Sequence, residues 1–445
     1  MDLSLISASL IGIVLLLVLI LYFRIHAFIS LLIASIAVGL IVGMPIGELF
    51  NSIQQGMGST LGFVALVVGL GAIFGAILEH SGGALAMANY MIKKLGVSKA
   101  PWAMSITGFI IAIPVFFDVA FIILVPVIYA LQKATKKSLL LFAIPLLSGL
   151  VITHAFIPPT PGPVAVADII GVELGWVILM GIIVGLPVAI LTGPIFGKWI
   201  SKRIHLTSPN LDEAASEEFK LPIGILFGII AIPIVLIILG TLLKSEIGFL
   251  VSLPEFVQQM IELCGHPVSA LIISNLVAWY VLGIRNNFSK EQLLDISNKS
   301  IAPAGLIILL TGAGGVFKQI LIDTGTGEML ANYFAHAGLS TLVFAYIAAV
   351  LIRILQGSAT VAMITAAGLT APLIQLVDSD LNKALLVIAI ASGASIMSHV
   401  NDSGFWLVSK YLGMDEKQTF KSWTLMTTII SISGFSLVML LSIFV

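Results

Sequence analysis

Residues 69–90 read GLGAIFGAILEHSGGALAMANY, and residues 312–333 read GAGGVFKQILIDTGTGEMLANY, a second copy of the same pattern 243 positions later. The identical positions are Gly69, Gly71, Phe74, Ile77, Leu78, Gly82, Ala88, Asn89 and Tyr90, matched by Gly312, Gly314, Phe317, Ile320, Leu321, Gly325, Ala331, Asn332 and Tyr333. The correspondence continues downstream, where Ser148-Gly149 matches Ser392-Gly393 and His154 matches His399 at nearly the same spacing. The sequence therefore predicts two related halves.

Long uncharged segments surround both copies. Of the 445 residues, 59% are hydrophobic and 10% are charged, against about 45–50% and about 25% in soluble domains. Uncharged runs of the roughly 18 residues that a spanning helix needs cover residues 3–23, 25–47, 49–78, 174–197, 221–243, 300–317 and 422–445. We therefore expect an all-α polytopic membrane protein.

Composition and motifs argue against several other classes. The net charge of −1 gives no basic footprint for nucleic acid, and the single Cys264 cannot form an internal disulfide. Met1 and Asp2 provide no basic leader, so the first apolar run is expected to be a retained helix and not a signal peptide. Neither HExxH nor GxSxG occurs. We expect a protein that is not an enzyme and that has no cofactor and no metal.

The distribution of lysine and arginine predicts the membrane topology, because cytoplasmic loops carry the excess of basic residues. With the N-terminus outside, Arg24 lies inside after the first helix. Lysines lie on both sides of segment 101–131, namely Lys93, Lys94 and Lys99 before it and Lys133, Lys136 and Lys137 after it. A segment with basic residues at both ends enters and leaves on the same side, so it reads as a re-entrant hairpin with its tip near residues 114–118.

The same reasoning divides the whole chain. The first repeat, 1–200, has the hairpin at about 101–131 and a broken helix at about 138–170, and the hydrophilic segment 201–220 is a cytoplasmic linker. The second repeat, 221–445, has a hairpin at about 340–375 and a broken helix at about 384–412.

Five crossings in the first half insert the second half upside down, which gives about 10 crossings, two re-entrant hairpins and two broken helices. Both termini are then periplasmic, and all but four of the 21 basic residues are cytoplasmic. Such inverted-topology repeats are typical of secondary transporters.

The hairpin tips and helix breaks are the expected functional sites, because irregular backbone at membrane depth persists only in protein or around a wet cavity. The helix N-termini exposed there attract anions. The first break is HAFIPPTPGP, residues 154–163, and the second is SHVNDSGFW, residues 398–406. The predicted substrate-binding residues are Thr160, Arg353, Gln356, Gly357, Ser358, Thr360, Asn401 and Ser403.

Four titratable residues are candidates for proton coupling: Asp118, Asp402, His154 and His399. A carboxyl group within an apolar segment suggests function, and burial favours its protonated form. Each residue also has a simpler interpretation, since both aspartates are suited to capping a helix and both histidines to packing. Arg353 is suited equally to a substrate carboxylate and to a carboxylate of the protein.

Five motifs resemble the gluconate:proton symporter family, of the gluconate permease type, within the wider ion-transporter superfamily. They are FFDVAFIILVP (116–126), HAFIPPTPGP (154–163), GAGGVFKQ (312–319), RILQGSATVA (353–362) and SHVNDSGFW (398–406). The resemblance runs nearly end to end. It implies uptake of gluconate or a related sugar acid with protons across a bacterial inner membrane. It also implies a homodimer, with a fixed scaffold and an elevator-like moving domain that holds both hairpins.

Two positions differ from the pattern of that family, with Asp118 where glutamate is usual and Thr160 where many members have histidine. Substrates other than gluconate therefore remain open, including D-serine and other small carboxylates. An inorganic-ion antiporter of the same superfamily is a further alternative. Polar side chains favour a sugar acid over an inorganic ion, namely those of Ser358, Thr360, Asn401 and Ser403. The expected partners are this anion, protons and membrane lipids.

Overall fold

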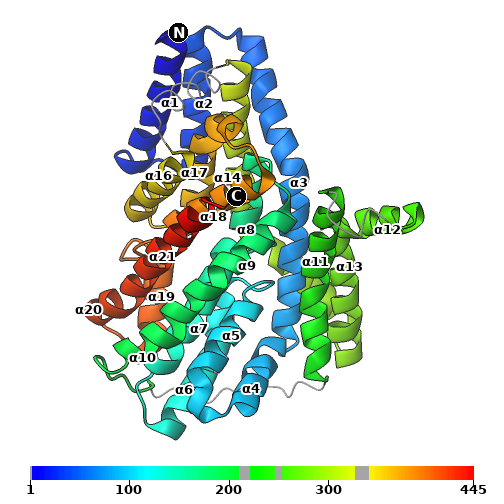
Figure 1. Cartoon of the computed structure of the whole chain (residues 1–445), viewed down its shortest axis with the longest axis vertical. Coiled ribbons are helices and arrows are strands. Elements are labelled where there is room, and N and C mark those ends of the chain that lie inside the picture. The colour runs from blue at the N-terminus through cyan, green and yellow to red at the C-terminus, as the bar shows by residue number, and fades with distance from the viewer. Residues whose placement is uncertain (1–2, 210–220, 246–252, 326–339, 445) are drawn as a thin grey trace.

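Two long helices, α3 (Ile46–His80) and α14 (Lys290–Asp323), lie against each other and form the most extensive helix–helix contact among the described residues. The structure is a computed structural model that describes residues 3–209, 221–245, 253–325 and 340–444. Figure 1 shows α3 running beside the other helices over much of the molecule's length. The end of the second repeat copy, from residue 326, and linker residues 210–220 lie outside the described residues.

The first half contains a helical hairpin and an interrupted helix. Its elements are α1 (Leu3–Leu21), α2 (Ala27–Val42), α3, α4 (Gly83–Leu95), η1 (Val97–Lys99), α5 (Ala100–Ile111), α6 (Phe117–Thr135), α7 (Leu140–Phe156), α8 (Pro161–Ile170), α9 (Leu174–Ile190), the π-helical turn η2 (Leu191–Ile195) and α10 (Phe196–Ile200). Helices α5 and α6 form the hairpin, with Pro114 between them. The chain leaves helical geometry between α7 and α8 because the prolines there have no amide hydrogen to continue a helix.

The second half also contains a helical hairpin followed by an interrupted helix. It contains α11 (Ile223–Lys244), α12 (Glu255–Gly265), α13 (Pro267–Ala278), η4 (Trp279–Gly283), η5 (Ile284–Asn286), α14, α16 (Thr341–Gln356), α17 (Ala359–Thr370), η6 (Ala371–Leu376), α18 (Asp380–Ala394), α19 (Ser403–Leu412), α20 (Glu416–Thr419), η7 (Phe420–Thr424) and α21 (Leu425–Leu441). Here α16 and α17 form the hairpin, and residues 395–402 interrupt the helix between α18 and α19.

Gly149 and Gly393, which are matched in the sequence, each lie at a close contact between two helices. A Cβ atom at Gly149 of α7 would lie 2.4 Å from the carbonyl oxygen of Ser105 on α5. A Cβ atom at Gly393 of α18 would lie 2.6 Å from the carbonyl oxygen of Tyr346 on α16. Each glycine therefore lets the first arm of a hairpin pack directly on the first arm of an interrupted helix.

The fold class is confirmed as all-α and polytopic. Within the described ranges, nine helical segments are long and apolar enough to cross a membrane. In the most apolar stretch of α7–α8, 83% of the residues are buried inside the protein, whereas in that of α11 only 33% are buried. The segment α7–α8 is therefore central and α11 is peripheral. The sequence did not predict α4, nor the amphipathic α12, which projects sideways beside α11 and α13 in Figure 1.

Candidate functional site

The N-terminal ends of four helices, α6, α8, α17 and α19, border one cavity of about 700 Å³. Two of these helices are the second arms of the hairpins, and the other two follow the helix breaks. Residues that are far apart in sequence thus face the same space. Its polar lining is formed by Asp118, His154, Arg353, Gln356, Ser358, Thr360, Ser395, Asn401, Asp402, Ser403, Trp423 and Thr427.

The four helices point the positive ends of their dipoles at the cavity. No side chain caps α6 or α8, whereas Ser358 accepts from the amide of Val361 at the start of α17 and Asp402 accepts from the amide of Gly404 at the start of α19. The first-turn amides of a helix have no acceptor within the helix, and the positive end of its dipole favours anions. The arrangement therefore suits an anionic ligand.

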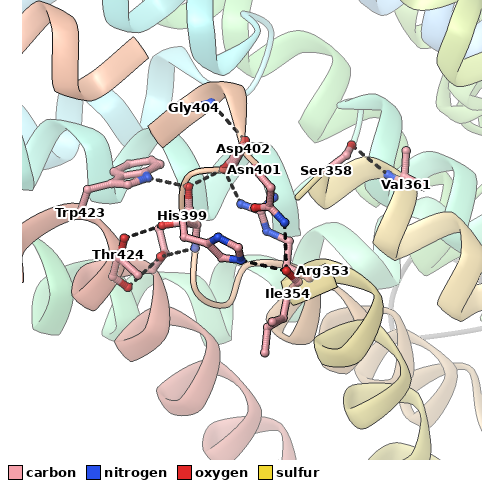
Figure 2. Close-up of polar contacts among 12 residues, drawn as sticks. Arg353, Ile354, Ser358, Val361, His399, Asn401, Asp402, Gly404, Trp423 and Thr424 are labelled. Carbon is pink, nitrogen blue, oxygen red and sulfur yellow. Dashed lines mark hydrogen bonds and ion pairs between the residues drawn. The ribbon is translucent and has the colours of Figure 1, made fainter. Parts of the chain in front are cut away.

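An ion pair joins the second hairpin to the second break. The Nη2 atom of Arg353, at the end of α16, lies 2.5 Å from Oδ2 of Asp402, and the two side chains are only 5% and 14% exposed. Asp402 also accepts from the Ser398 hydroxyl, which in turn accepts from Nε1 of Trp423 at 2.6 Å (Figure 2). Among the described residues, each hydrogen bond of the Asp402 side chain is donated to its oxygens by Arg353, Ser398 or the Gly404 amide, so these surroundings suit an acceptor carboxylate.

Three buried polar atoms at the second hairpin tip have no hydrogen-bond partner in the described part of the chain. They are Nε and Nη1 of Arg353 and Oε1 of Gln356. Buried polar groups are nearly always paired, because an unpaired one loses its hydration without compensation. Both residues line the cavity, so a polar ligand there would supply partners.

A second set of bonds fixes the hairpin tip to the break. The side chains of His399, through Nε2 at 2.8 Å, and Asn401, through Nδ2 at 2.9 Å, both donate to the carbonyl of Ile354 (Figure 2). Because a carbonyl only accepts, Nε2 of His399 carries the hydrogen. Gly357 follows with φ +86°, and a Cβ atom there would lie 2.3 Å from the carbonyl oxygen of Asn401. Only glycine fits this contact without a shift of the backbone.

Asp118 and His154 face the cavity from the first half of the chain. Asp118 lies in the first turn of α6 with an exposed side chain, and it has no hydrogen-bond or ion-pair partner among the described residues. His154 lies in the last turn of α7, its Nδ1 has no partner in the described chain, and its ring meets Phe116 edge-on at 6.2 Å.

Two of the twelve predicted site residues do not line the cavity. Thr160 is buried, and its hydroxyl donates to the carbonyl of Ile157 at 2.7 Å. His399 instead donates to the carbonyl of Ile354, as described above. The other ten do line it: Asp118, His154, Arg353, Gln356, Gly357, Ser358, Thr360, Asn401, Asp402 and Ser403.

Sequence reasoning missed part of the lining. Trp423 comes from the π-helical turn η7, and Thr427 lies one turn later. Both lie in the uncharged run 422–445. Nothing in the sequence of that run indicates that it borders the cavity. Ser395 follows α18 directly and falls just before the predicted motif.

A smaller cavity of about 400 Å³ adjoins the first, and Phe116, Val119 and Pro303 line both. Its charged residues come from the end of α3 and the start of α14, where Lys299 pairs with Asp295 at 2.7 Å. These three residues therefore lie between the two spaces.

The whole chain matches a known family of membrane proteins. Residues 4–444 fit the model of the GntP family of permeases. The chain belongs to the GntP family. Its membership makes it a permease rather than an enzyme, and the apolar helices place it in the inner membrane as a multi-pass protein.

Curated GntP relatives cover nearly its full length. A gluconate permease of Bacillus subtilis is 40% identical over 98% of this chain and 98% of its own. A gluconate permease of Pseudomonas aeruginosa is 38% identical over 99% and 98%. A low-affinity gluconate transporter of Escherichia coli K12 is 38% identical over 97% of both chains.

Solved structures share the fold at low sequence identity. The YdaH transporter of Alcanivorax borkumensis superposes with a TM-score of 0.64 at 12% identity, over 92% of this chain and 96% of its own. MtrF of Neisseria gonorrhoeae gives 0.59 at 15% identity, over 98% and 95%. These likenesses establish the architecture only.

Proposed function

We propose that this GntP permease imports a small sugar acid, gluconate foremost, together with protons. The observation that carries the proposal is the cavity in which four helix N-termini surround a buried arginine with two unpaired nitrogens. Such a site offers a carboxylate the helix N-termini and the two Arg353 donors that have no partner in the described chain. The near full-length relatives named as gluconate permeases support gluconate as that carboxylate.

Different residues of the cavity lining suit the two ends of such a substrate. The carboxylate would lie against Arg353, where its oxygens accept hydrogens that have no acceptor in the described part of the chain. The polyol chain would meet the polar groups of Gln356, Thr360 and Ser403. A cavity of about 700 Å³ lies within the roughly 300–1,000 Å³ of small-molecule sites.

Charge balance assigns proton coupling to Asp118 in preference to Asp402. Arg353 and Asp402 neutralise each other, so an ionised Asp118 leaves one uncompensated negative charge in the cavity. A substrate carboxylate would add a second and be repelled by the first. Protonation of Asp118 removes this repulsion and links proton binding to substrate binding. His154, on the same side of the cavity, is the next candidate.

The same proposal includes the larger architecture expected from the sequence. We assign residues 1–200 and 221–445 to two inverted repeats, with both termini periplasmic, and the packing at Gly149 and Gly393 supports equivalent roles for the two halves. We further propose a homodimer in which the hairpins and interrupted helices move together as an elevator. The ion pair between Arg353 and Asp402 supports such joint motion of the second hairpin with the second break.

D-serine transport is a second candidate, because Asp118 has no partner in the described chain and an ionised carboxylate there would bind the ammonium group. The two candidates require opposite states of Asp118, protonated for gluconate and ionised for D-serine. An inorganic-ion antiporter is less well supported, since the nitrogens of Arg353 that lack a partner in the described chain are hydrogen-bond donors and cannot coordinate a cation.

Uptake by the purified protein in proteoliposomes tests the proposal. Labelled gluconate, other sugar acids, D-serine and sodium are offered separately, with the outside made more acidic than the inside and with empty liposomes as the control. Gluconate should accumulate, and a protonophore should abolish the accumulation. Accumulation of D-serine without gluconate would transfer the assignment to the second candidate, and transport of sodium alone would overturn both.

A further inference from the structure

A third cavity, of about 570 Å³, lies away from the proposed transport site, between the start of α5 and α10. The ionisable side chains that line it are all of the basic type, namely Lys137, Lys198, Lys202 and His205. The three lysine side chains are exposed, and none has an acidic partner within 4.0 Å in the described part of the chain. Several unneutralised positive charges around one hollow repel one another, and a bound anion would relieve that repulsion.

Two rows of exposed apolar side chains lead away from this basic cavity. On α5, Trp102 and Ile106 are 43% and 38% exposed and lie four residues apart. On η2 and α10, Leu191, Ile195 and Trp199 are 40%, 54% and 41% exposed at the same spacing. Side chains four residues apart lie on one face of a helix, so each row forms a continuous apolar strip.

The two rows lie on helices that touch. A Cβ atom at Gly193 of η2 would lie 2.9 Å from Oγ of Ser105 on α5, so these helices pack closely beside the cavity. The two tryptophans lie at the basic end of the strips, which is where aromatic side chains gather at a membrane surface. Arg203 stacks on Trp199 at 3.7 Å from the ring centre and adds a further positive charge.

We propose that this cavity and its apolar strips bind one anionic phospholipid of the inner leaflet. The phosphate would lie among Lys137, Lys198 and Lys202, and the acyl chains would cover the strips on α5 and α10. Basic pockets between spanning helices on the cytoplasmic side bind such headgroups, and the topology proposed above places these lysines there. A soluble phosphate would satisfy the charge and leave the apolar strips uncovered.

Lipid binding by the purified full-length protein tests the proposal. The site variant is Lys198→Gln/Lys202→Gln, and the matched control is Lys410→Gln/Lys421→Gln, which removes two other exposed lysines. Gluconate uptake checks that each variant is folded. Each protein is titrated with phosphatidylglycerol or phosphatidylethanolamine, and the bound lipid is counted by native mass spectrometry. Inorganic phosphate and glycerol 3-phosphate are added as competitors without acyl chains.

The wild type and the control should bind phosphatidylglycerol in preference to phosphatidylethanolamine. The site variant should bind it more weakly, by roughly fivefold for each lysine removed. Equal binding by wild type and site variant would overturn the proposal, as would equal binding of the two lipids. Displacement of phosphatidylglycerol by equimolar inorganic phosphate would show a soluble-phosphate site and overturn the lipid assignment.

An apolar variant provides an independent measurement. Ile195→Asn places a polar side chain in the apolar strip on η2 and α10 and leaves the lysines intact. It should weaken phosphatidylglycerol binding and leave the weak binding of glycerol 3-phosphate unchanged. If Ile195→Asn binds the lipid as tightly as the wild type, the strip does not hold acyl chains and the proposal fails.

Discussion

Arg353 has two tasks that can be separated by mutation, because its Nη2 pairs with Asp402 while Nε and Nη1 have no partner in the described chain. Arg353→Gln leaves Asp402 buried without its counter-ion, a change that costs about 3–5 kcal/mol in buried pairs. It also removes the proposed contact with the substrate carboxylate. A hydrogen bond to a charged group contributes about 1.5–3 kcal/mol, so its loss should weaken gluconate binding roughly tenfold to a hundredfold. We predict lower thermal stability and loss of gluconate binding.

The double variant Arg353→Gln/Asp402→Asn is the control for this prediction. It removes both charges, so much of the lost stability should return while gluconate binding stays weak. Unfolding temperature and calorimetric binding measure the two properties on the same sample. A double variant as unstable as Arg353→Gln would contradict the structural role of the pair, and wild-type binding would contradict the substrate role.

At the scale of elements, the turn between α16 and α17 depends on Gly357. An alanine there would adopt a left-handed conformation that costs L-residues roughly 1–2 kcal/mol, and its Cβ atom would press on the carbonyl of Asn401. We predict that Gly357→Ala lowers the unfolding temperature and weakens gluconate binding. Gly305→Ala, within α14 and with nothing within 4 Å of its Cβ position, should do neither. Equal effects of the two changes would mean that the tip is not a fixed part of the site.

The irregular elements could be predicted from the sequence where a residue forbids a regular helix. The prolines between α7 and α8 cannot continue the hydrogen-bond ladder, and Asn401, Asp402 and Ser403 are polar residues in an apolar segment. The partner of Asp402 could not be predicted, because two equally suitable partners for Arg353 were open and only tertiary packing chooses between them. The contribution of Trp423 was hidden for the same reason, since an apolar span gives no indication of which face borders a cavity.

At the scale of the whole molecule, the proposed topology assigns a membrane side to every loop. Single cysteines can be introduced at Lys136 and Asp378 after Cys264→Ser, since Cys264 is the one native cysteine. A membrane-impermeant maleimide applied to intact cells should label Asp378→Cys, and it should label Lys136→Cys only after the membrane is opened. Labelling of Lys136→Cys in intact cells would contradict the assignment of the first hairpin to the cytoplasmic side.

The central claim is that the anion and the proton bind together in the cavity where the helix N-termini meet. It is tested most directly by the protons taken up when gluconate binds to the purified protein in weakly buffered solution, at a pH where carboxyl groups in water are ionised. We predict that the wild type takes up protons in proportion to the gluconate bound, and that Asp118→Asn binds gluconate without taking up protons. Gluconate binding to the wild type without proton uptake, or the same uptake by Asp118→Asn, would contradict the account.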